Sequence, residues 1–325
     1  MKLRIIIPNY NGAHFLKNCL DSLRHQTYQN FRITVVDNGS SDESVTLLQR
    51  YYPEADILNL PYNKGFAAAA NAGIRSSKEP YVMLLNNDTT VKHNCVEKLM
   101  NAITSDSQIF SAGAHVLSMR APYLTDTSGD FYSFFGYAFC RGQGLSAARF
   151  ALSRHNQLST FTNCGCAVIY RRCLLQKTGL FDERFFAYLE DVDLGFRARK
   201  MGYKNIVCTE AHVFHYGSGT TGAKYTPTKV YLAARNNIWL RQKNLSLFQR
   251  LIQAPFFLVG TIAKYFYFCR IHLGSFYSKG ILEGIKTRHF LHPQTSATTQ
   301  SDLRTEYWLL YGSLLYIVQL FQRHL

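Results

Sequence analysis

The sequence predicts an α/β protein with a Rossmann-like, mostly parallel sheet flanked by helices, and a helical extension at the C-terminal end. Short apolar runs alternate with amphipathic segments over the first 85 residues, which is typical of strands joined by crossover helices. Polar clusters follow three of these runs, at residues 8–11, 37–41 and 86–88. The chain has 325 residues and 47% apolar content, which is enough for one large domain with an appendage or for two medium domains.

Each element of this alternation is predicted from a local pattern. Residues 3–7 form an apolar run that ends at Pro8 and a turn-prone Asn-Tyr-Asn-Gly sequence, which predicts a buried strand. Apolar side chains recur at helical spacing over residues 13–26, which predicts a helix. The same reasoning predicts strands at residues 31–36, 57–60 and 81–85, and helices at residues 43–51 and 66–75.

The middle of the chain, residues 110–180, shows few clean periods. Its aromatic and glycine-rich stretches favour loops and irregular strands that shape an acceptor pocket. Residues 161–170 predict one further buried strand.

An acidic cluster opens the amphipathic run at residues 185–203. Acidic side chains in a first turn complement the helix dipole, and Asp193 with Arg197 has the spacing of a structural ion pair. The adjacent carboxylates of Glu190 and Asp191 also suit a site in which one carboxylate stays ionised and takes a proton.

The net charge and the cysteine spacing indicate the kind of partner and the cellular compartment of the protein. The formal net charge of +15 points to an anionic partner, such as nucleic acid, a membrane surface or a phosphorylated substrate. The eight cysteines form no CxxC pair, and Cys164 and Cys166 cannot easily close a relaxed disulfide, so we expect reduced cysteines in a cytosolic protein. The first apolar run is only three isoleucines long, so we expect no signal peptide.

The C-terminal quarter differs in composition from the rest. Residues 241–325 carry ten Lys or Arg and three Asp or Glu, together with many aromatic side chains. Residues 252–269 approach the length of a membrane span but contain a glutamine, a proline and a lysine, so an interfacial helix fits better. Residues 306–321 repeat the pattern. We therefore predict a main domain at residues 1–240 and a membrane-associating helical region after it; ordinary helices that pack on the main domain or on a second subunit are the alternative.

Six segments, in this order and at these separations, resemble the family 2 glycosyltransferases, which have the GT-A fold. They are IIIPNYNG, VVDNGSSDES, NKGFAAAANAGI, YVMLLNNDTTV, GLFDERFFAYLEDVDLGFRARKMGY and HYGSG. The resemblance covers residues 3–240 and is strongest to a subgroup of rhamnosyltransferases and related polysaccharide-building enzymes. It implies a nucleotide-sugar site beyond the carboxyl ends of the parallel strands.

The resemblance assigns one group of residues to the nucleotide sugar: Pro8, Tyr10, Asn11, Asp37, Gly65, Asn86, Asn87 and Arg235. Asp37 would accept the N3–H of a pyrimidine base, bordered by the backbone of the first loop. Gly65 would let the main chain approach the nucleotide at a helix N-terminus. Arg235 would stabilise the departing diphosphate. The alternative for the polar clusters is an ordinary turn, since Asn, Asp and Gly dominate turns.

The resemblance also implies a divalent cation, Mg²⁺ or Mn²⁺. Asn86-Asn87-Asp88 occupies the place of the family's DxD motif and keeps a carboxylate only at Asp88. Asp88 and His215 would hold the cation, which bridges the two phosphates of the donor. The asparagine at position 86 reduces the negative charge of this site and leaves strict metal dependence open.

The resemblance places the catalytic base at Asp191, with Glu190 positioning it or holding acceptor hydroxyls. A single carboxylate base implies direct displacement and inversion at the anomeric carbon. The expected reaction moves a sugar from dTDP-rhamnose or a UDP-sugar to a growing, lipid-linked cell-surface polysaccharide. The expected location is the cytoplasm, peripheral to the anionic inner face of the cell membrane, with no nucleic-acid partner and with homo-oligomerisation open.

Two other functions compete with this reading. A sugar nucleotidyltransferase would share the nucleotide pocket, but such enzymes usually carry basic residues in their N-terminal loop, and residues 8–12 contain none. A non-enzymatic protein that binds membrane or nucleic acid would account for the charge alone. Its Lys, Arg and aromatic residues would then cluster on the α/β part as well.

Overall fold

The first quarter of the chain builds the parallel half of the main sheet. The computed structural model describes residues 2–151, 156–217, 225–288 and 299–322. Strands β1 (Leu3–Asn9), β2 (Phe31–Asp37), β3 (Asp56–Asn59) and β4 (Tyr81–Leu85) lie in the order β4-β1-β2-β3, and every pair is parallel. They are joined by α1 (Ala13–Arg24), α2 (Ser44–Tyr51) and α3 (Phe66–Ser76). The strands and helices predicted for this region are confirmed.

The second half of the sheet is mixed in direction. Strand β11 (Ala167–Arg171) runs antiparallel to both β4 and β6 (Ile109–Ser118), while β12 (Lys204–His215) runs parallel to β6. The sheet margins are β5 (Thr89–Val91), β7 (Thr125–Thr127) and β10 (Gln157–Thr160), and β8 (Asp130–Tyr132) and β9 (Ala138–Cys140) form a separate hairpin. The sheet as a whole is therefore mixed, and its parallel character is concentrated in the first four strands.

One strand prediction needs correction, and two long strands were not foreseen. The strand expected at residues 161–170 begins only at Ala167, because Asn163 and Gly165 belong to a turn-containing connection. Strands β6 and β12 were missed because β6 is buried almost throughout and β12 is buried at every position over residues 205–209, and apolar and polar side chains do not alternate along these stretches.

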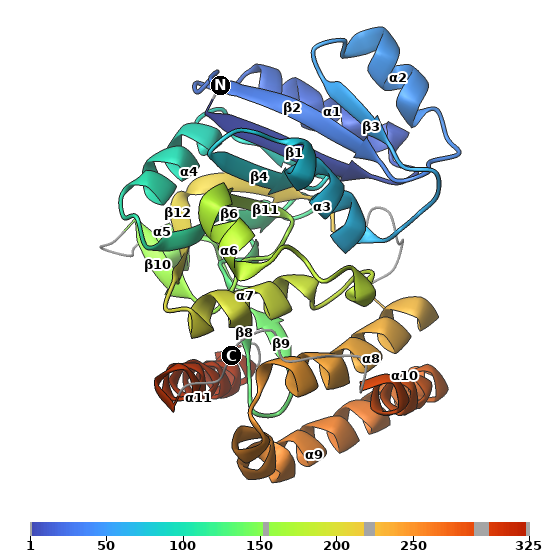
Figure 1. Ribbon diagram of the computed structural model, residues 1–325, viewed down its shortest axis with the longest axis vertical. Coiled ribbons are helices and arrows are strands. Elements are labelled where there is room, and N and C mark those ends of the chain that lie inside the picture. Colours follow the sequence, from blue (N-terminus) through green and yellow to red (C-terminus); the bar gives the residue numbers. More distant parts are fainter. Residues whose placement is uncertain (1, 152–155, 218–224, 289–298, 323–325) are drawn as a thin grey trace.

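Helices cover both faces of the sheet (Figure 1). One face packs Ile5 and Ile7 against α1, α2 and α4 (Cys95–Thr104). The other packs Ile6 and Val36 against α3, α6 (Arg172–Thr178) and α7 (Glu190–Lys200). Two short pieces complete this part, α5 (Ala148–Ala151) and the 3₁₀ turn η1 (Glu183–Phe185). Because β1 places side chains alternately in the two cores, Ile5, Ile6 and Ile7 are all apolar.

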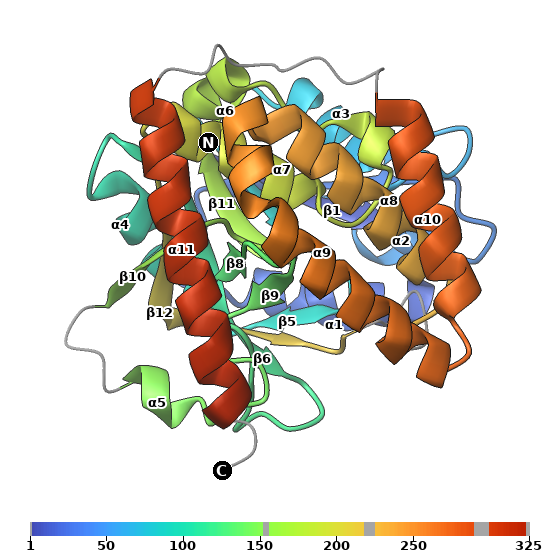
Figure 2. The same cartoon turned by 90° about the horizontal axis from the view of Figure 1, so that it is seen from below.

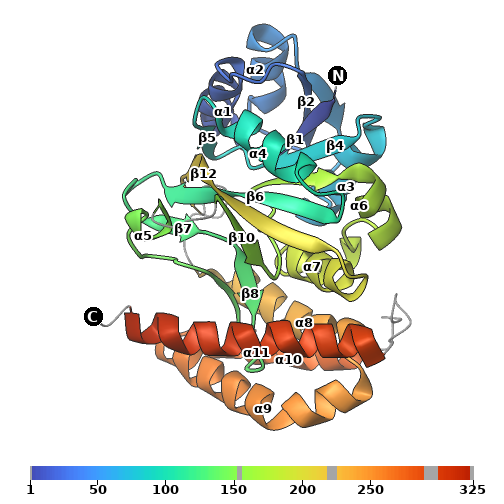
Figure 3. The same cartoon turned by 90° about the vertical axis from the view of Figure 1, so that its left-hand side faces the viewer.

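A layer of helices lies below the sheet (Figures 1 and 3). It contains α8 (Pro227–Asn244), α9 (Leu247–Arg270), α10 (Gly274–Thr287) and α11 (Thr299–Gln322). The domain boundary predicted at residue 240 falls inside α8. Trp239 of α8 and Leu309 of α11 share a core with Phe196 of α7, so the helical layer is continuous with the core of the α/β part. Figure 2 shows α9, α10 and α11 spread across the lower face.

Helices α9 and α11 are amphipathic, but they bury polar side chains and expose apolar ones, which is the reverse of a helix whose outer face contacts water. The buried positions of α9 include Gln249 and Gln253, and those of α11 include Thr305 and Gln319. Their outward positions are apolar: Leu247, Phe248, Leu251, Ile252, Phe256, Leu258, Val259, Ile262, Phe266, Leu303, Leu310, Leu314, Val318 and Phe321 are all exposed. Helix α9 is also long and apolar enough to cross a membrane, with a mean hydropathy of 1.3 over its best window, of which 17% is buried. An outward apolar face of this kind suits contact with lipid or with another protein.

Candidate active site

The polar ends of three neighbouring strands meet at one edge of the sheet. The Asn9 amide donates to Asp37 Oδ1 at 3.2 Å, and the Asn87 amide donates to Asn9 Oδ1 at 2.7 Å. Asp37 Oδ2 also accepts from the backbone N–H of Ser40 at 3.0 Å. All three of Asn9, Asp37 and Asn87 are buried. The structure thus joins two predicted nucleotide-binding residues through Asn9, which the sequence analysis did not single out.

The loops that follow β1 and β2 are held together by side-chain hydrogen bonds. Asn11 has a φ of +50° and accepts from the backbone N–H of Ser41 at 2.8 Å through its side-chain oxygen. The Asn11 N–H donates to Ser40 Oγ at 2.9 Å. Asn11 therefore has a structural role in this state. Pro8 and Tyr10 are partly exposed beside it, and so is Asn86 at the end of β4.

Gly65 lies against the segment that precedes α7. Its φ is +86°, and a Cβ there would lie 2.4 Å from the carbonyl oxygen of Phe186. The close approach predicted at this glycine is thus made in the structure by Phe186, whose carbonyl also accepts from the N–H of Ala67 at 3.2 Å. Gly65 brings the start of α3 next to the carboxylates of α7.

Asp88 and His215 form a pair at the edge where β12 ends. His215 Nε2 lies 3.2 Å from Asp88 Oδ1, and His215 Nδ1 lies 2.7 Å from Asp126 Oδ2. Burial alone would lower the pKa of His215, but the Cys166 thiol and the two carboxylates outweigh it, so the pKa is raised. Both ring nitrogens of His215 thus face a carboxylate, and with a neutral imidazole Asp126 would orient Nε2 toward a cation bound by Asp88, as carboxylate partners do for many metal-binding histidines. The pair fits a divalent cation, and Asp126 supplies the orienting partner that the sequence analysis missed. The glycine-rich loop expected after His215 lies, from residue 218 on, outside the described residues.

The first turn of α7 holds the buried carboxyl group of Glu190 and the partly exposed one of Asp191. Asp191 Oδ1 accepts from the N–H of Val192 at 2.8 Å, and Asp191 Oδ2 accepts from the N–H of Gly165 at 3.4 Å. Burial raises the pKa of Asp191 despite these bonds. Burial and the neighbouring Asp191 charge raise the pKa of Glu190 well above its usual range. Glu190 Oε2 is buried and has no hydrogen-bond partner in the described part of the chain.

The segment Cys164-Gly165-Cys166 connects the two halves of the site. Gly165 contacts Asp191 through its N–H, as given above, while the Cys166 carbonyl accepts from the Asn86 N–H at 2.8 Å. The Cys166 thiol lies against His215 and influences its pKa. The residue that contacts the candidate base Asp191 and the residue that contacts the candidate metal ligand His215 are therefore neighbours in the chain. All eight cysteines are free thiols, as predicted.

A third carboxyl group, Asp130 of β8, lies beside Asp191. One ligand atom from each of Asp130, Cys164 and Asp191 falls within 4.8 Å of the others. The Thr127 hydroxyl donates to Asp130 Oδ1 at 2.6 Å. Burial, followed by the Asp191 charge, raises the pKa of Asp130 to about 7. The sequence gave no signal for this residue, because β8 belongs to the segment without a clear period.

The backbone before α7 is held in an unusual conformation by α8. Phe186, Tyr188 and Leu189 all have positive φ values, between +66° and +72°. The Asn236 amide donates to the carbonyls of Phe185, Ala187 and Tyr188 at 2.7–3.0 Å. Such strained conformations persist only where the surroundings impose them, and they concentrate at functional sites.

Arg235, predicted to contact the departing diphosphate, lies next to Asn236 on α8. It donates to the Phe185 carbonyl at 3.2 Å, and its guanidinium lies 4.1 Å from the centre of the Trp239 ring. No contact to Asp88 or His215 is present among the described residues, so its predicted role in binding the diphosphate rests on the resemblance alone.

The predicted ion pair of Asp193 and Arg197 is confirmed and forms part of a larger buried network. The two side chains lie 2.9 Å apart, and the Lys243 ammonium lies 2.9 Å from Asp193 and 2.8 Å from Asp182. Asp193 and Lys243 are fully buried. Burial would raise the pKa of Asp193, but Arg197 and Lys243 outweigh it and lower the pKa. This network fixes α7 to α8 and is structural.

Comparisons with known proteins agree on one family. The family model described as "Glycosyl transferase family 2" matches residues 4–179, more than half of the chain. An uncharacterised glycosyltransferase of Rickettsia prowazekii is 31% identical over 59% of this chain and 57% of its own length, so the chain spans little more than half of that relative. The N-acetylglucosaminyl-diphospho-decaprenol L-rhamnosyltransferase of Mycobacterium tuberculosis is 26% identical over 74% of this chain and 86% of its own length.

A solved structure is similar to this one over most of the chain. The crystal structure of GalNAc-T7 with UDP, GalNAc and Mn²⁺ superposes with a TM-score of 0.62 at 13% identity, covering 89% of this chain and 57% of that one. At this identity the likeness concerns the fold alone. It confirms the GT-A architecture expected from the sequence.

Proposed function

This chain belongs to glycosyl transferase family 2, and we propose that it transfers a sugar, with inversion, from a nucleoside diphosphate to a growing, lipid-linked cell-surface polysaccharide. The observation that carries the proposal is the convergence of Asp191 and the Asp88–His215 pair on opposite ends of residues 164–166. Family membership also favours sugar transfer over the nucleotidyltransferase and the non-enzymatic binding protein considered from the sequence.

Asp191 is the proposed general base. Its pKa is raised by burial but it keeps two backbone N–H donors, so the carboxylate is both basic and fixed in position. The acceptor hydroxyl gives its proton to Asp191 as its oxygen forms a bond to the anomeric carbon. The bond from that carbon to the phosphate oxygen breaks, and the nucleoside diphosphate departs with the electron pair. Attack opposite the leaving group inverts the configuration.

Glu190 is the proposed contact for acceptor hydroxyls. Its raised pKa favours the protonated form, and its free Oε2 can then donate to or accept from a hydroxyl. A neutral Glu190 would also leave the negative charge of the pair on Asp191, where the proton must go.

The donor is proposed to lie along the ends of β1, β2 and β4. Each Asp37 oxygen has a spare lone pair besides the bonds to Asn9 and Ser40, which suffices for the single N3–H of uracil or thymine. Asn86, partly exposed, is positioned for the ribose. The donors proposed first are dTDP-rhamnose and UDP-sugars.

Asp88 and His215 would hold a divalent cation, Mg²⁺ or Mn²⁺. Such an ion supplies positive charge to the diphosphate as it departs. Asp126 would fix the His215 ring so that Nε2 faces the ion. Asn86 and Asn87 contribute no charge there, so Asp88 and the phosphate oxygens would provide the anionic ligands.

The acceptor is proposed to be presented at the cytoplasmic face of a membrane. The outward apolar faces of α9 and α11 and the basic character of residues 241–325 support docking on an anionic lipid surface. The mycobacterial relative is named for a decaprenol-linked substrate, which agrees with a lipid-linked acceptor.

Replacing Asp191 tests the mechanism. Transfer by Asp191→Asn should fall by about 10²–10⁴-fold, the usual contribution of a positioned base. Donor binding measured by calorimetry should stay within about twofold of the wild type, because Asp191 faces the acceptor. Asp106→Asn, which breaks an exposed ion pair with Lys204, is the matched control and should leave transfer unchanged. Unchanged turnover of Asp191→Asn, or a product linkage that retains the donor configuration by NMR, would overturn the proposal.

A further inference from the structure

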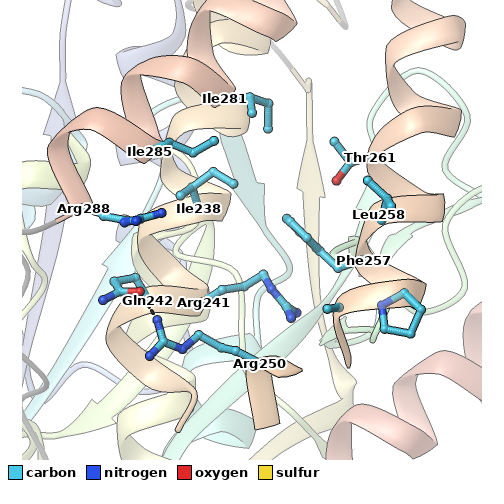
Figure 4. Close-up of a pocket in the computed structure, with 12 residues that line it drawn as sticks. Ile238, Arg241, Gln242, Arg250, Phe257, Leu258, Thr261, Ile281, Ile285 and Arg288 are labelled. Atoms are coloured by element: carbon cyan, nitrogen blue, oxygen red, sulfur yellow. Dashed lines mark hydrogen bonds between the residues drawn. The ribbon is translucent and has the colours of Figure 1, made fainter. Parts of the chain in front are cut away.

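An open cavity of about 580 Å³ lies in the helical layer, between α8, α9 and α10 (Figure 4). None of its lining residues belongs to the strand ends that form the candidate active site. The lining comprises Ile238, Arg241, Gln242, Arg250, Ala254, Pro255, Phe257, Leu258, Thr261, Ile281, Ile285 and Arg288. Its volume is in the range of small-molecule pockets.

Three arginines gather in one part of this cavity (Figure 4). Arg241 donates to the Gln253 side-chain oxygen at 3.1 Å, and Arg250 donates to the side-chain oxygen of Gln242. These acceptors are neutral amides. Glu306 of α11 lies beyond Gln253, which donates to it at 2.8 Å. Within the described residues no carboxylate comes within ion-pair distance of Arg241, Arg250 or Arg288, and Glu306 acts on Arg241 only at longer range.

The remaining wall of the cavity is apolar. Ile238, Ile281 and Ile285 line it from α8 and α10, and Phe257 and Leu258 line it from α9. The Phe257 ring also lies 4.2 Å from the Arg241 guanidinium, which joins the charged and apolar parts. Helix α9 continues this wall into the outward apolar face described above.

We propose that this cavity binds an anionic membrane lipid whose headgroup is a phosphate monoester or a diphosphate. Guanidinium groups bind phosphate oxygens through paired charge-assisted hydrogen bonds, and three of them match more than one negative charge. The apolar wall takes the first part of the hydrocarbon chain. A free phosphate or nucleotide would leave that wall without a partner. The inference rests on the proposed docking of α9 and α11 on a membrane, and it does not depend on the catalytic roles of Asp191 or Asp88.

Soluble lipid phosphates test the site without a membrane. Farnesyl diphosphate and dioctanoyl phosphatidic acid are titrated into the full-length protein by calorimetry, in EDTA so that a metal-dependent donor site cannot contribute. Inorganic pyrophosphate, farnesol and dioctanoyl phosphatidylglycerol are titrated in parallel. We expect the two lipid phosphates to bind at least about tenfold more tightly than any of these three, because only they combine a hydrocarbon chain with a terminal phosphate that can carry more than one negative charge. The ratio between the two shows whether a prenyl or an acyl chain is preferred.

Variants locate the binding. Arg250→Gln and Arg288→Gln should each weaken binding by about tenfold or more. Arg270→Gln, on the exposed end of α9 and outside the cavity, removes the same charge and should have no effect. Ile285→Trp fills the cavity while keeping every arginine, and should also weaken binding. Arg250 and Arg288 are not fully buried, so these variants are expected to keep the thermal stability of the wild type.

Several outcomes would overturn the inference. Equal loss with Arg270→Gln would mean general electrostatic attraction, and no loss with Ile285→Trp would mean that the chain lies elsewhere. Equally tight binding of pyrophosphate would mean a simple anion site. Vesicle flotation with neutral and anionic lipids separately tests membrane docking, so failure of the cavity site can be told from failure of the docking or of sugar transfer.

Discussion

Replacing Asp130 by asparagine should stabilise the protein at neutral pH. Asp130 is only 7% exposed, and its carboxyl group lies beside Asp191, so its pKa is about 7 in the folded state. The value in an unfolded chain is about 3.9. The folded state therefore holds the proton more tightly, and the stability that comes with the proton is lost as pH rises from about 4 to about 7. Asparagine is isosteric, stays neutral and can still accept from Thr127.

The magnitude follows from the pKa difference. About three pKa units at about 1.4 kcal/mol each give an upper value of about 4 kcal/mol in the free energy of unfolding. For a chain of 325 residues this corresponds to a rise of about 6 °C in Tm. Thermal unfolding of wild type and Asp130→Asn is followed from pH 4 to pH 8. The two Tm values should coincide near pH 4 and diverge as pH rises, with the variant higher.

A constant difference across this pH range, or a less stable variant at pH 8, would refute the reasoning about Asp130. The activity of the same variant adds a second readout. If the charge on Asp130 supports the basicity of Asp191, transfer by Asp130→Asn should fall even as the protein becomes more stable. That combination is typical of residues kept for function at a cost in stability.

Two further predictions concern the support of the site. Lys243→Met leaves two buried carboxylates without their shared cation and should lower the free energy of unfolding by about 3–5 kcal/mol. The control Lys98→Met breaks an exposed ion pair and should change Tm little. Equal Tm values for the two variants in thermal unfolding would contradict this expectation. Gly65→Ala should lower Tm and turnover together, because the new Cβ would strike the Phe186 carbonyl in addition to the cost of about 1–2 kcal/mol for its positive φ. Gly144→Ala has a similar φ and open space around it, so it should lose only the smaller amount, and an equal loss in both variants would count against the steric argument.

The parallel half of the fold could be predicted from the sequence because its signals are local. Each strand is a short apolar run, and each ends in turn-forming residues, as at Pro8 and Asp37. The mixed half could not, because Ile109–Ser118 and residues 205–209 are buried on both faces and lack alternation. Helix α10 was missed for a related reason: Gly280 and Gly284, which disfavour helix in isolation, are needed where α10 lies against the backbone of α8.

The residues of the candidate site also divide into those that a sequence pattern marks and those that it does not. Asp88, Asp191 and His215 were identified because they stand in segments that resemble a family, and their roles stay predictions; the structure pairs Asp88 with His215 and bonds Asp191 to Gly165. Asp126 and Asp130 act only through partners 89 and 61 positions away in the chain, His215 and Asp191. No local pattern marks such residues, so only the folded arrangement reveals them.

Helix α8 links the chemistry to the proposed membrane face. Asn236 holds the strained backbone before α7, and the next residue, Asn237, accepts from the Tyr132 hydroxyl at 2.5 Å and donates to the Gly136 carbonyl at 3.1 Å. One turn further on, Arg241 lines the cavity. A single rigid helix thus contacts the backbone before Asp191, the hairpin that carries Asp130, and the proposed lipid site. If α9 and α11 lie on a membrane, α8 sets the height of Asp191 above it, and an acceptor with a lipid anchor would reach Asp191 only at a fixed distance from its phosphate. The helical layer would then select acceptors by the position of the sugar along the lipid-linked chain. Such selection requires a fixed distance between the membrane and Asp191. A shared core between the α/β part and the helical layer would keep that distance, whereas a flexible linker would not.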